Sequence, residues 1–93
     1  MNLTGAWETD ASDARALSEL GDVLLEFGEN GDLIYTICGQ EKNQVMKLRY
    51  SVEGSSIVTD QPSRPRIERT EFLLEGDTLT LAFGGVPYRF VRA

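Results

Sequence analysis

The sequence has no histidine, and this absence removes more kinds of chemistry than any other feature of its composition. Ser-His-Asp and Cys-His catalytic arrangements use an imidazole as their base, and most zinc sites contain imidazole or several thiolates. The chain has one cysteine, Cys38, so it can form neither an internal disulfide nor a thiolate-rich metal site. No loop has the spacing of acidic residues that binds calcium. We therefore predict a protein that is not an enzyme and holds no metal or other cofactor.

Basic residues and long hydrophobic runs are also scarce. Nine Lys and Arg stand against 15 Asp and Glu, so the formal net charge at pH 7 is −6. An acidic chain is poorly suited to nucleic-acid phosphates or to anionic lipid. No apolar run approaches the roughly 20 residues that cross a bilayer, and the first residues do not have the pattern of a signal peptide. We predict no nucleic-acid partner, no membrane and a cytoplasmic location, the alternative being a secreted form whose leader has been removed.

The 93 residues suffice for one domain, 1–93, with a single modest core. Glycine-containing turn sequences recur at 28–32, 52–56, 74–78 and 83–87. The segments between them place apolar residues at every second position, as strands packed on a core do. Eight strands are predicted: Leu3–Glu8, Asp22–Phe27, Leu33–Cys38, Gln44–Val52, Ser56–Asp60, Pro65–Leu74, Thr78–Phe83 and Pro87–Arg92.

The spacing of the turns predicts how these strands are connected. Gly54 and Gly76 lie one period of about 22 residues apart, which corresponds to two strands and two turns of an antiparallel meander. Parallel strands would need helical crossovers, and only "ASDARALSEL" (11–20) has a helical pattern. We predict an all-β fold, an eight-stranded antiparallel up-and-down barrel with one short helix between its first two strands. Ser12 is the expected N-cap of the helix, and Gly21 is expected to end it.

The stripe of apolar residues on that helix indicates its position. Ala14, Leu17 and Leu20 follow one another at intervals of three residues and could face the mouth of the barrel. Cys38, at the end of the third strand, is expected to be a small buried hydrophobic residue.

The only tryptophan, Trp7, follows Gly5 by two residues at the start of the first strand, and Arg89 and Arg92 lie near the end of the last strand. Three more segments follow the same rhythm: Phe27–Gly31, Gly76–Leu81 and Tyr88–Arg92. Together they resemble the lipocalins and fatty-acid-binding proteins (calycins), and most of all the compact bacterial lipocalin-like domains with Gly-x-Trp. The resemblance implies that an arginine packs across the tryptophan and closes one end of the barrel, and that the interior can hold a ligand.

Elementary geometry supports this pairing. In a closed meander the first and last strands are antiparallel neighbours, so the start of one lies beside the end of the other. Arg92 shares a strand face with Tyr88 and Phe90, so we expect it to cover Trp7, with Arg89 as the alternative because the register cannot be read from sequence. A guanidinium over an indole contributes about 0.5–2 kcal/mol. Gly5 would leave room at this end, and a ligand site is expected at the opposite one.

The inward-facing apolar residues could either fill the barrel or line a ligand cavity. Aligning the two repeats at Gly54 and Gly76 matches Met46 with Glu68, so that Glu68 is expected to face the interior. We predict these ligand-binding residues: Tyr35, Met46, Leu48, Tyr50, Arg66, Glu68 and Phe72. In the alternative, segment 65–69 extends into solvent, and Arg64, Arg66 and Arg69 pair with nearby acids.

Two functions follow from these alternatives. The first is binding of a small, mostly apolar ligand inside the barrel. The second is a protein-interaction or self-associating module with a packed barrel and no ligand. A homodimer is expected in the second case if the barrel does not close, because unpaired strand edges tend to find a partner.

Overall fold

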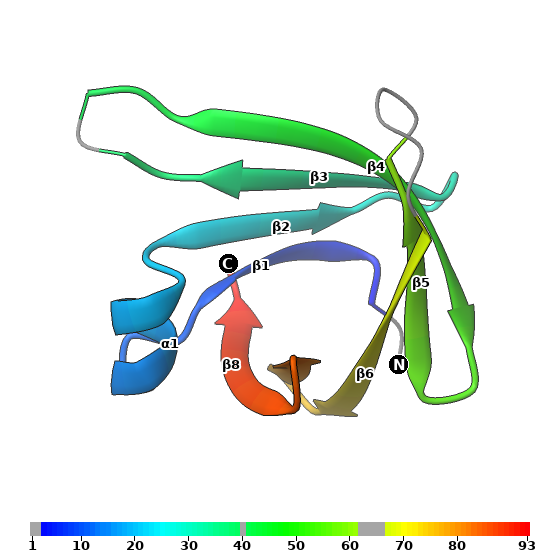
Figure 1. Cartoon of the computed structure of the whole chain (residues 1–93). Helices are drawn as coiled ribbons and strands as arrows, with labels where there is room; N and C mark the ends of the chain where they lie inside the picture. The colour runs from blue at the N-terminus through cyan, green and yellow to red at the C-terminus, as the bar shows by residue number, and fades with distance from the viewer. Residues whose placement is uncertain (1–2, 40, 62–66) are drawn as a thin grey trace.

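Eight antiparallel strands close into a barrel in the computed structural model, which describes residues 3–39, 41–61 and 67–93. Each strand pairs with the next in the chain, and β8 returns to pair with β1 (Figure 1). The elements are β1 (Gly5–Thr9), α1 (Ala14–Glu19), β2 (Val23–Phe27), β3 (Asp32–Ile37), β4 (Gln44–Glu53), β5 (Ser56–Asp60), β6 (Ile67–Glu75), β7 (Thr78–Phe83) and β8 (Val86–Arg92). The predicted up-and-down barrel with one helix between β1 and β2 is therefore confirmed.

Period-two alternation orients the strands as the sequence predicts. In β2, Val23, Leu25 and Phe27 are buried while Glu26 is exposed. In β4, by contrast, every residue is exposed or only partly buried. Its inward-facing side chains stay accessible because the part of the interior that they border is not filled.

We call the end of the barrel at which β1 begins and β8 ends the closed end. Trp7 in β1 is fully buried there, and its Nε1 donates a hydrogen bond to the carbonyl oxygen of Leu3 at 2.9 Å. The guanidinium carbon of Arg92 lies 4.0 Å from the centroid of the Trp7 ring, and its Nη1 donates to the carbonyl oxygen of Thr4 at 2.8 Å. The structure thus places Arg92, and not Arg89, over the indole.

Gly5 makes room for this arrangement. Its φ is +120°, a conformation that L-residues with a side chain rarely adopt. A Cβ added at Gly5 would lie 2.9 Å from Nη1 of Arg92, so a larger residue would displace the guanidinium as well as strain the backbone.

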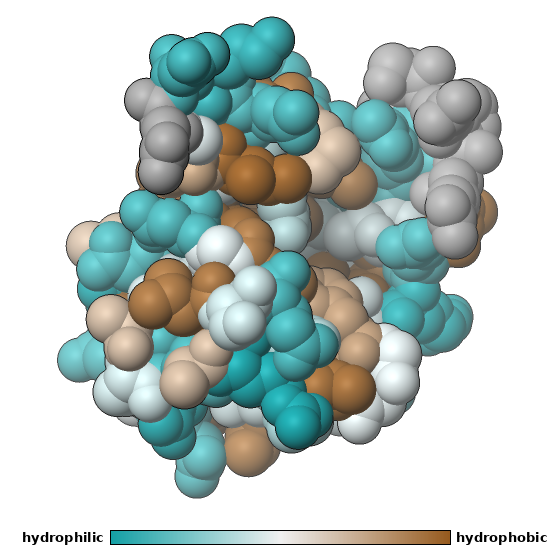
Figure 2. Space-filling model, turned by 60° about the vertical axis from the view of Figure 1, so that its left-hand side comes forward, coloured by the Kyte–Doolittle hydropathy of each residue, from teal (hydrophilic) through white to brown (hydrophobic). Residues whose placement is uncertain are grey.

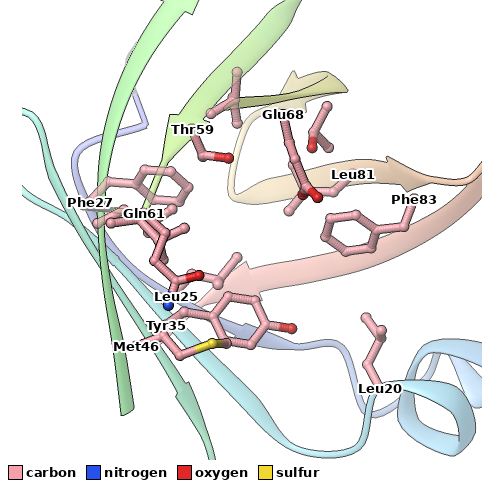
Figure 3. Close-up of a pocket in the computed structure, with 14 residues that line it drawn as sticks. Leu20, Leu25, Phe27, Tyr35, Met46, Thr59, Gln61, Glu68, Leu81 and Phe83 are labelled. Atoms are coloured by element: carbon pink, nitrogen blue, oxygen red, sulfur yellow. The ribbon is translucent and has the colours of Figure 1, made fainter. Parts of the chain in front are cut away.

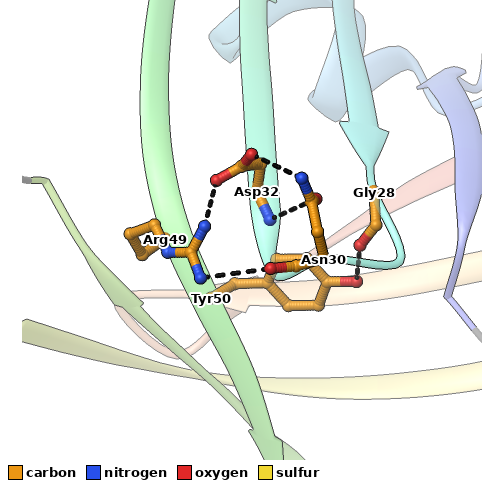
Figure 4. A network of polar contacts seen from close by, with 5 residues as sticks. All are labelled: Gly28, Asn30, Asp32, Arg49 and Tyr50. Atoms are coloured by element: carbon orange, nitrogen blue, oxygen red, sulfur yellow. Dashed lines mark hydrogen bonds and ion pairs between the residues drawn. The ribbon is translucent and has the colours of Figure 1, made fainter.

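A polar network also stabilises the closed end, where the β2–β3 turn meets β4 (Figure 4). Arg49 forms an ion pair with Asp32 and donates from Nη2 to the carbonyl oxygen of Asn30 at 3.1 Å. The Tyr50 hydroxyl donates to the carbonyl oxygen of Gly28 at 2.7 Å. These contacts tie the turn to β4, so the closed end has a structural role.

The opposite end carries α1, and we call it the open end (Figure 1). Asp13, rather than the expected Ser12, caps the helix: its Oδ1 accepts from the backbone N–H of Ala16 at 3.2 Å. The Ser12 hydroxyl instead donates to Asp10 at 2.7 Å. Gly21 follows the helix with φ +77°, as expected. Among the described residues, no helix is long and apolar enough to span a membrane.

The helix turns a different face inward from the one expected. Ala16 is its one buried residue, Ala14 is exposed, and Leu17 is 43% exposed. Leu20 is partly buried and packs against the core, as the stripe predicted. Ala16 and Leu20 are four residues apart and so lie on one face of the helix, which is the face that packs on the barrel.

Candidate ligand-binding site

The barrel interior is filled near the closed end and hollow near the open end. Figure 2 shows the face at the open end, with a hollow between the rim segments and hydrophobic side chains along its walls. The hollow is a pocket of about 330 Å³. Its walls come from β2 to β7 and from the end of α1, and consist of Leu20, Leu25, Phe27, Leu33, Tyr35, Met46, Leu48, Ile57, Thr59, Gln61, Glu68, Thr70, Leu81 and Phe83 (Figure 3).

Strand register places most of the apolar residues on one continuous wall. Tyr35 in β3 is opposite Leu25 in β2 on one side and opposite Met46 in β4 on the other. Leu33 pairs in the same way with Leu48. Since paired residues point to the same face of a sheet, these five side chains all face the pocket.

The wall on β5 and β6 carries polar side chains beside the apolar Ile57. Thr59 is opposite Glu68, and Ile57 is opposite Thr70. Gln61 follows the end of β5 and also lines the pocket. In Figure 3, Glu68 and Tyr35 extend toward the middle of the pocket from different walls. Apolar walls with a few polar groups on one side are typical of small-molecule sites, whose volumes are roughly 300–1,000 Å³.

Helix α1 covers part of the open end and is held on β8 by polar contacts. Oδ2 of Asp13 accepts from the backbone N–H of Arg89 at 2.9 Å, and Arg89 Nε lies 2.9 Å from Oδ2 of Asp10. The Tyr88 hydroxyl donates to Glu19 at 3.0 Å. This hydrogen bond favours the protonated phenol and raises the pKa of Tyr88, with burial acting in the same direction. The helix is therefore anchored over the β8 side of the opening.

Tyr35 is the pocket residue whose ionisation the surroundings change most clearly. Burial disfavours the phenolate and raises the pKa of Tyr35. Its side chain is thus a neutral hydroxyl at physiological pH, able to donate or accept one hydrogen bond in an otherwise apolar wall.

Comparison with profiles of known protein families, with curated proteins and with solved structures finds no match for this chain.

Four of the predicted ligand-binding residues lie together in the pocket: Tyr35, Met46, Leu48 and Glu68. Tyr50 and Phe72 lie elsewhere in the barrel. The Tyr50 ring packs edge-on against Phe27, with centroids 5.1 Å apart, and its hydroxyl belongs to the closed-end network. Phe72 is partly buried against the core. Arg66 lies outside the described residues, as does Arg64.

Several pocket residues were not among those predicted to bind a ligand. Ile57, Thr59 and Gln61 are every second residue, so alternation along the fifth strand would have placed all three on the inner face. They were missed because the fifth strand contains few large hydrophobic residues. Leu20 could not be assigned from alternation, since its position depends on how α1 packs.

Two other sequence-based expectations concern Cys38 and Arg69. Cys38 is exposed rather than buried, because β3 ends at Ile37 and Cys38 already belongs to the following connection. Arg69 pairs with Glu53, with Nη2 and Oε1 3.1 Å apart, on the outer surface. Within residues 3–39, 41–61 and 67–93, no three acidic or sulfur-containing side chains are grouped as metal ligands would be.

Proposed function

We propose that this protein is a lipocalin-like (calycin) barrel that binds a small, mostly apolar molecule without catalysing a reaction. The observation that carries the proposal is the pocket of about 330 Å³ at the open end, bordered by apolar side chains from β2, β3, β4 and β7. Burial of apolar ligand surface in such a pocket is favourable by about 25 cal/mol per Å² before the costs of association. The contact of Trp7 with Arg92 and the strand order support the relationship to lipocalins.

The pocket can be tested by filling it. 1-Octanol is a suitable neutral probe, and isothermal titration calorimetry measures its affinity. Leu48→Trp, on the apolar wall, should weaken binding at least about tenfold because the indole takes the space of the ligand. Thr70→Trp provides a second filling variant from the opposite wall if the first does not fold, which circular dichroism will show.

Leu73→Trp is the matched control, because Leu73 lies on the outer surface and is 56% exposed. It introduces the same side chain and should leave the affinity for 1-octanol unchanged. Absence of binding to the unmodified protein would contradict the proposal, as would equal affinity of the folded Leu48→Trp variant. Native mass spectrometry of the freshly purified protein would show whether a ligand is retained from the cell.

The interaction-module alternative receives less support. Since β1 pairs with β8, the strands that the structure describes form a closed barrel, without the free edge strands on which an edge-to-edge dimer would depend. A homodimer through another surface remains a prediction, which light scattering at micromolar concentration can test.

For the location we propose a reducing compartment such as the cytoplasm, since an exposed thiol at Cys38 is prone to oxidation elsewhere.

A further inference from the structure

The hydroxyl of Tyr35 has no hydrogen-bond partner among residues 3–39, 41–61 and 67–93, although Tyr35 lines the pocket. The chain has three tyrosines, and the other two use their hydroxyls inside the protein. Tyr50 donates to the carbonyl oxygen of Gly28 at 2.7 Å, and Tyr88 donates to Glu19 at 3.0 Å. Buried tyrosine hydroxyls usually find such a partner. The Tyr35 hydroxyl is therefore available to a molecule that enters the pocket.

The position of Tyr35 explains why its hydroxyl is left without a partner. The residues opposite it on the neighbouring strands are Leu25 in β2 and Met46 in β4, and neither offers a strong hydrogen-bonding group. Figure 3 shows the ring of Tyr35 extending from its strand into the pocket, with the hydroxyl oxygen at the far end. Burial raises the pKa of Tyr35, so the hydroxyl keeps its proton at physiological pH.

A protonated phenol in an apolar wall is best suited to donating a hydrogen bond. Its ordinary pKa of about 10 makes it more acidic than an aliphatic alcohol, and the more acidic hydroxyl is the stronger donor. The ligand atom facing Tyr35 is then an acceptor, and a carbonyl oxygen offers two lone pairs for this bond. Hydrogen bonds are also stronger in apolar surroundings than in water.

The charges of the molecule favour a neutral carbonyl group over a carboxylate. Among the described residues that line the pocket, none is a lysine or an arginine. Moving a carboxylate into such surroundings from water is costly. The formal net charge of −6 also repels small anions as they approach the protein.

We propose that Tyr35 selects ligands with an apolar body and a neutral carbonyl group, the phenol donating a hydrogen bond to the carbonyl oxygen while the body contacts Leu25 and Met46 beside it. Ketones, esters and carboxamides of modest size belong to this class. The inference rests on the proposed function and specifies the chemical class of its ligand.

The test separates this hydrogen bond from the apolar contacts. Acetophenone and α-methylstyrene have nearly the same shape, and a methylene group in the second replaces the carbonyl oxygen of the first. Isothermal titration calorimetry measures the affinity of each probe for the unmodified protein and for Tyr35→Phe, which loses the hydroxyl and keeps the ring. Tyr35→Phe should weaken acetophenone binding about two- to tenfold, the range for one hydrogen bond, and leave α-methylstyrene binding unchanged. Benzoate, the anionic counterpart of acetophenone, should bind the unmodified protein at least about tenfold more weakly than acetophenone does.

Tyr50→Phe is the matched control, because it removes the same group from the closed end of the barrel. Its affinity for acetophenone should equal that of the unmodified protein. The inference would be overturned by an equal loss of both probes in Tyr35→Phe, by an equal loss of acetophenone in Tyr50→Phe, or by benzoate binding as tightly as acetophenone. If 1-octanol and α-methylstyrene bind while Tyr35→Phe leaves acetophenone unchanged, the ligand class is wrong and the pocket stands. If no probe binds, 1-octanol included, the proposed function fails and the inference fails with it.

Discussion

At the scale of single residues, the closed end depends on the fit of two side chains, a backbone carbonyl and a glycine. Trp7 is fully buried, Leu3 accepts a hydrogen bond from its indole, and Arg92 covers its face. Gly5 lets the guanidinium pass, since a methyl group there would lie 2.9 Å from Nη1. The arrangement excludes water from Trp7 and leaves the open end as the way into the barrel.

Replacing Arg92 should therefore affect both stability and fluorescence. Arg92→Ala removes the contact with the indole and the hydrogen bond to Thr4, and should lower the free energy of unfolding by about 1–3 kcal/mol. Because Trp7 is the only tryptophan, its emission should shift to longer wavelength as water reaches the ring. Urea denaturation followed by fluorescence measures both quantities.

Two further variants make this experiment specific. Gly5→Ala, which displaces the guanidinium, should shift the emission in the same direction. Arg69→Ala removes an exposed arginine paired with Glu53 and should change stability by less than about 0.5 kcal/mol, with no shift of the Trp7 emission. A red shift in Arg69→Ala, or none in Arg92→Ala, would show that Arg92 does not shield the indole.

At the scale of secondary-structure elements, α1 is short and depends on contacts outside itself. An isolated six-residue helix is not stable in water. Asp13 connects the helix to the barrel, because one carboxylate oxygen caps Ala16 and the other accepts from the backbone of Arg89. Thr9 adds a second connection, since its hydroxyl donates to Gly21 and accepts from the N–H of Val23, both at 2.9 Å.

Asp13→Ala should accordingly lower the melting temperature by several degrees, because it removes the cap and the attachment to β8 together. Ser12→Ala should lower it less, since the Ser12 hydroxyl bonds only to Asp10. Thermal unfolding followed by circular dichroism gives both values. A larger loss in Ser12→Ala than in Asp13→Ala would mean that Ser12 is the functional cap after all.

At the scale of the whole molecule, hydrogen-bonded carboxylates link stability to pH. The hydroxyl and N–H of Ser12 lower the pKa of Asp10, with Arg89 adding to the effect. The backbone N–H groups of Ala16 and Arg89 lower the pKa of Asp13. The hydroxyls of Ser56 and Ser55 lower the pKa of Glu71. A carboxyl group whose pKa is lower in the folded state stabilises the fold above its unfolded pKa and loses this contribution as pH falls through the folded value.

Stability should therefore fall as the pH drops below about 4, the ordinary range of carboxyl groups. The urea midpoint should be lower at pH 3 than at pH 7, and Glu71→Gln should reduce the difference between the two. Glu75→Gln, an exposed carboxyl of the same strand, is the matched control and should leave the difference unchanged. Identical midpoints at the two pH values, or equal differences in the two variants, would contradict this linkage.

Local patterns in the sequence were sufficient for the architecture. Alternation along "VMKLRYSVE" and the glycine turns predicted the strands, and the 22-residue period predicted their meander order. The contact between Trp7 and Arg92 was also predicted. In a closed meander of eight strands the first and last strands are antiparallel neighbours, so the start of one lies beside the end of the other. These features depend on residues a few positions apart or on strand parity alone.

Only the tertiary structure decided whether the barrel is filled. The free volume at the open end depends on the side chains of six strands together. A change of register in one strand would replace the side chains that this strand contributes to the pocket wall. The repeat alignment placed Glu68 inside because strand parity is a local property. The neighbouring Thr59 and Gln61, and the cover supplied by Leu20, depend on how β5, β6 and α1 meet in space. The fold was thus encoded in short-range periodicity, whereas the pocket and its polar wall result from long-range packing.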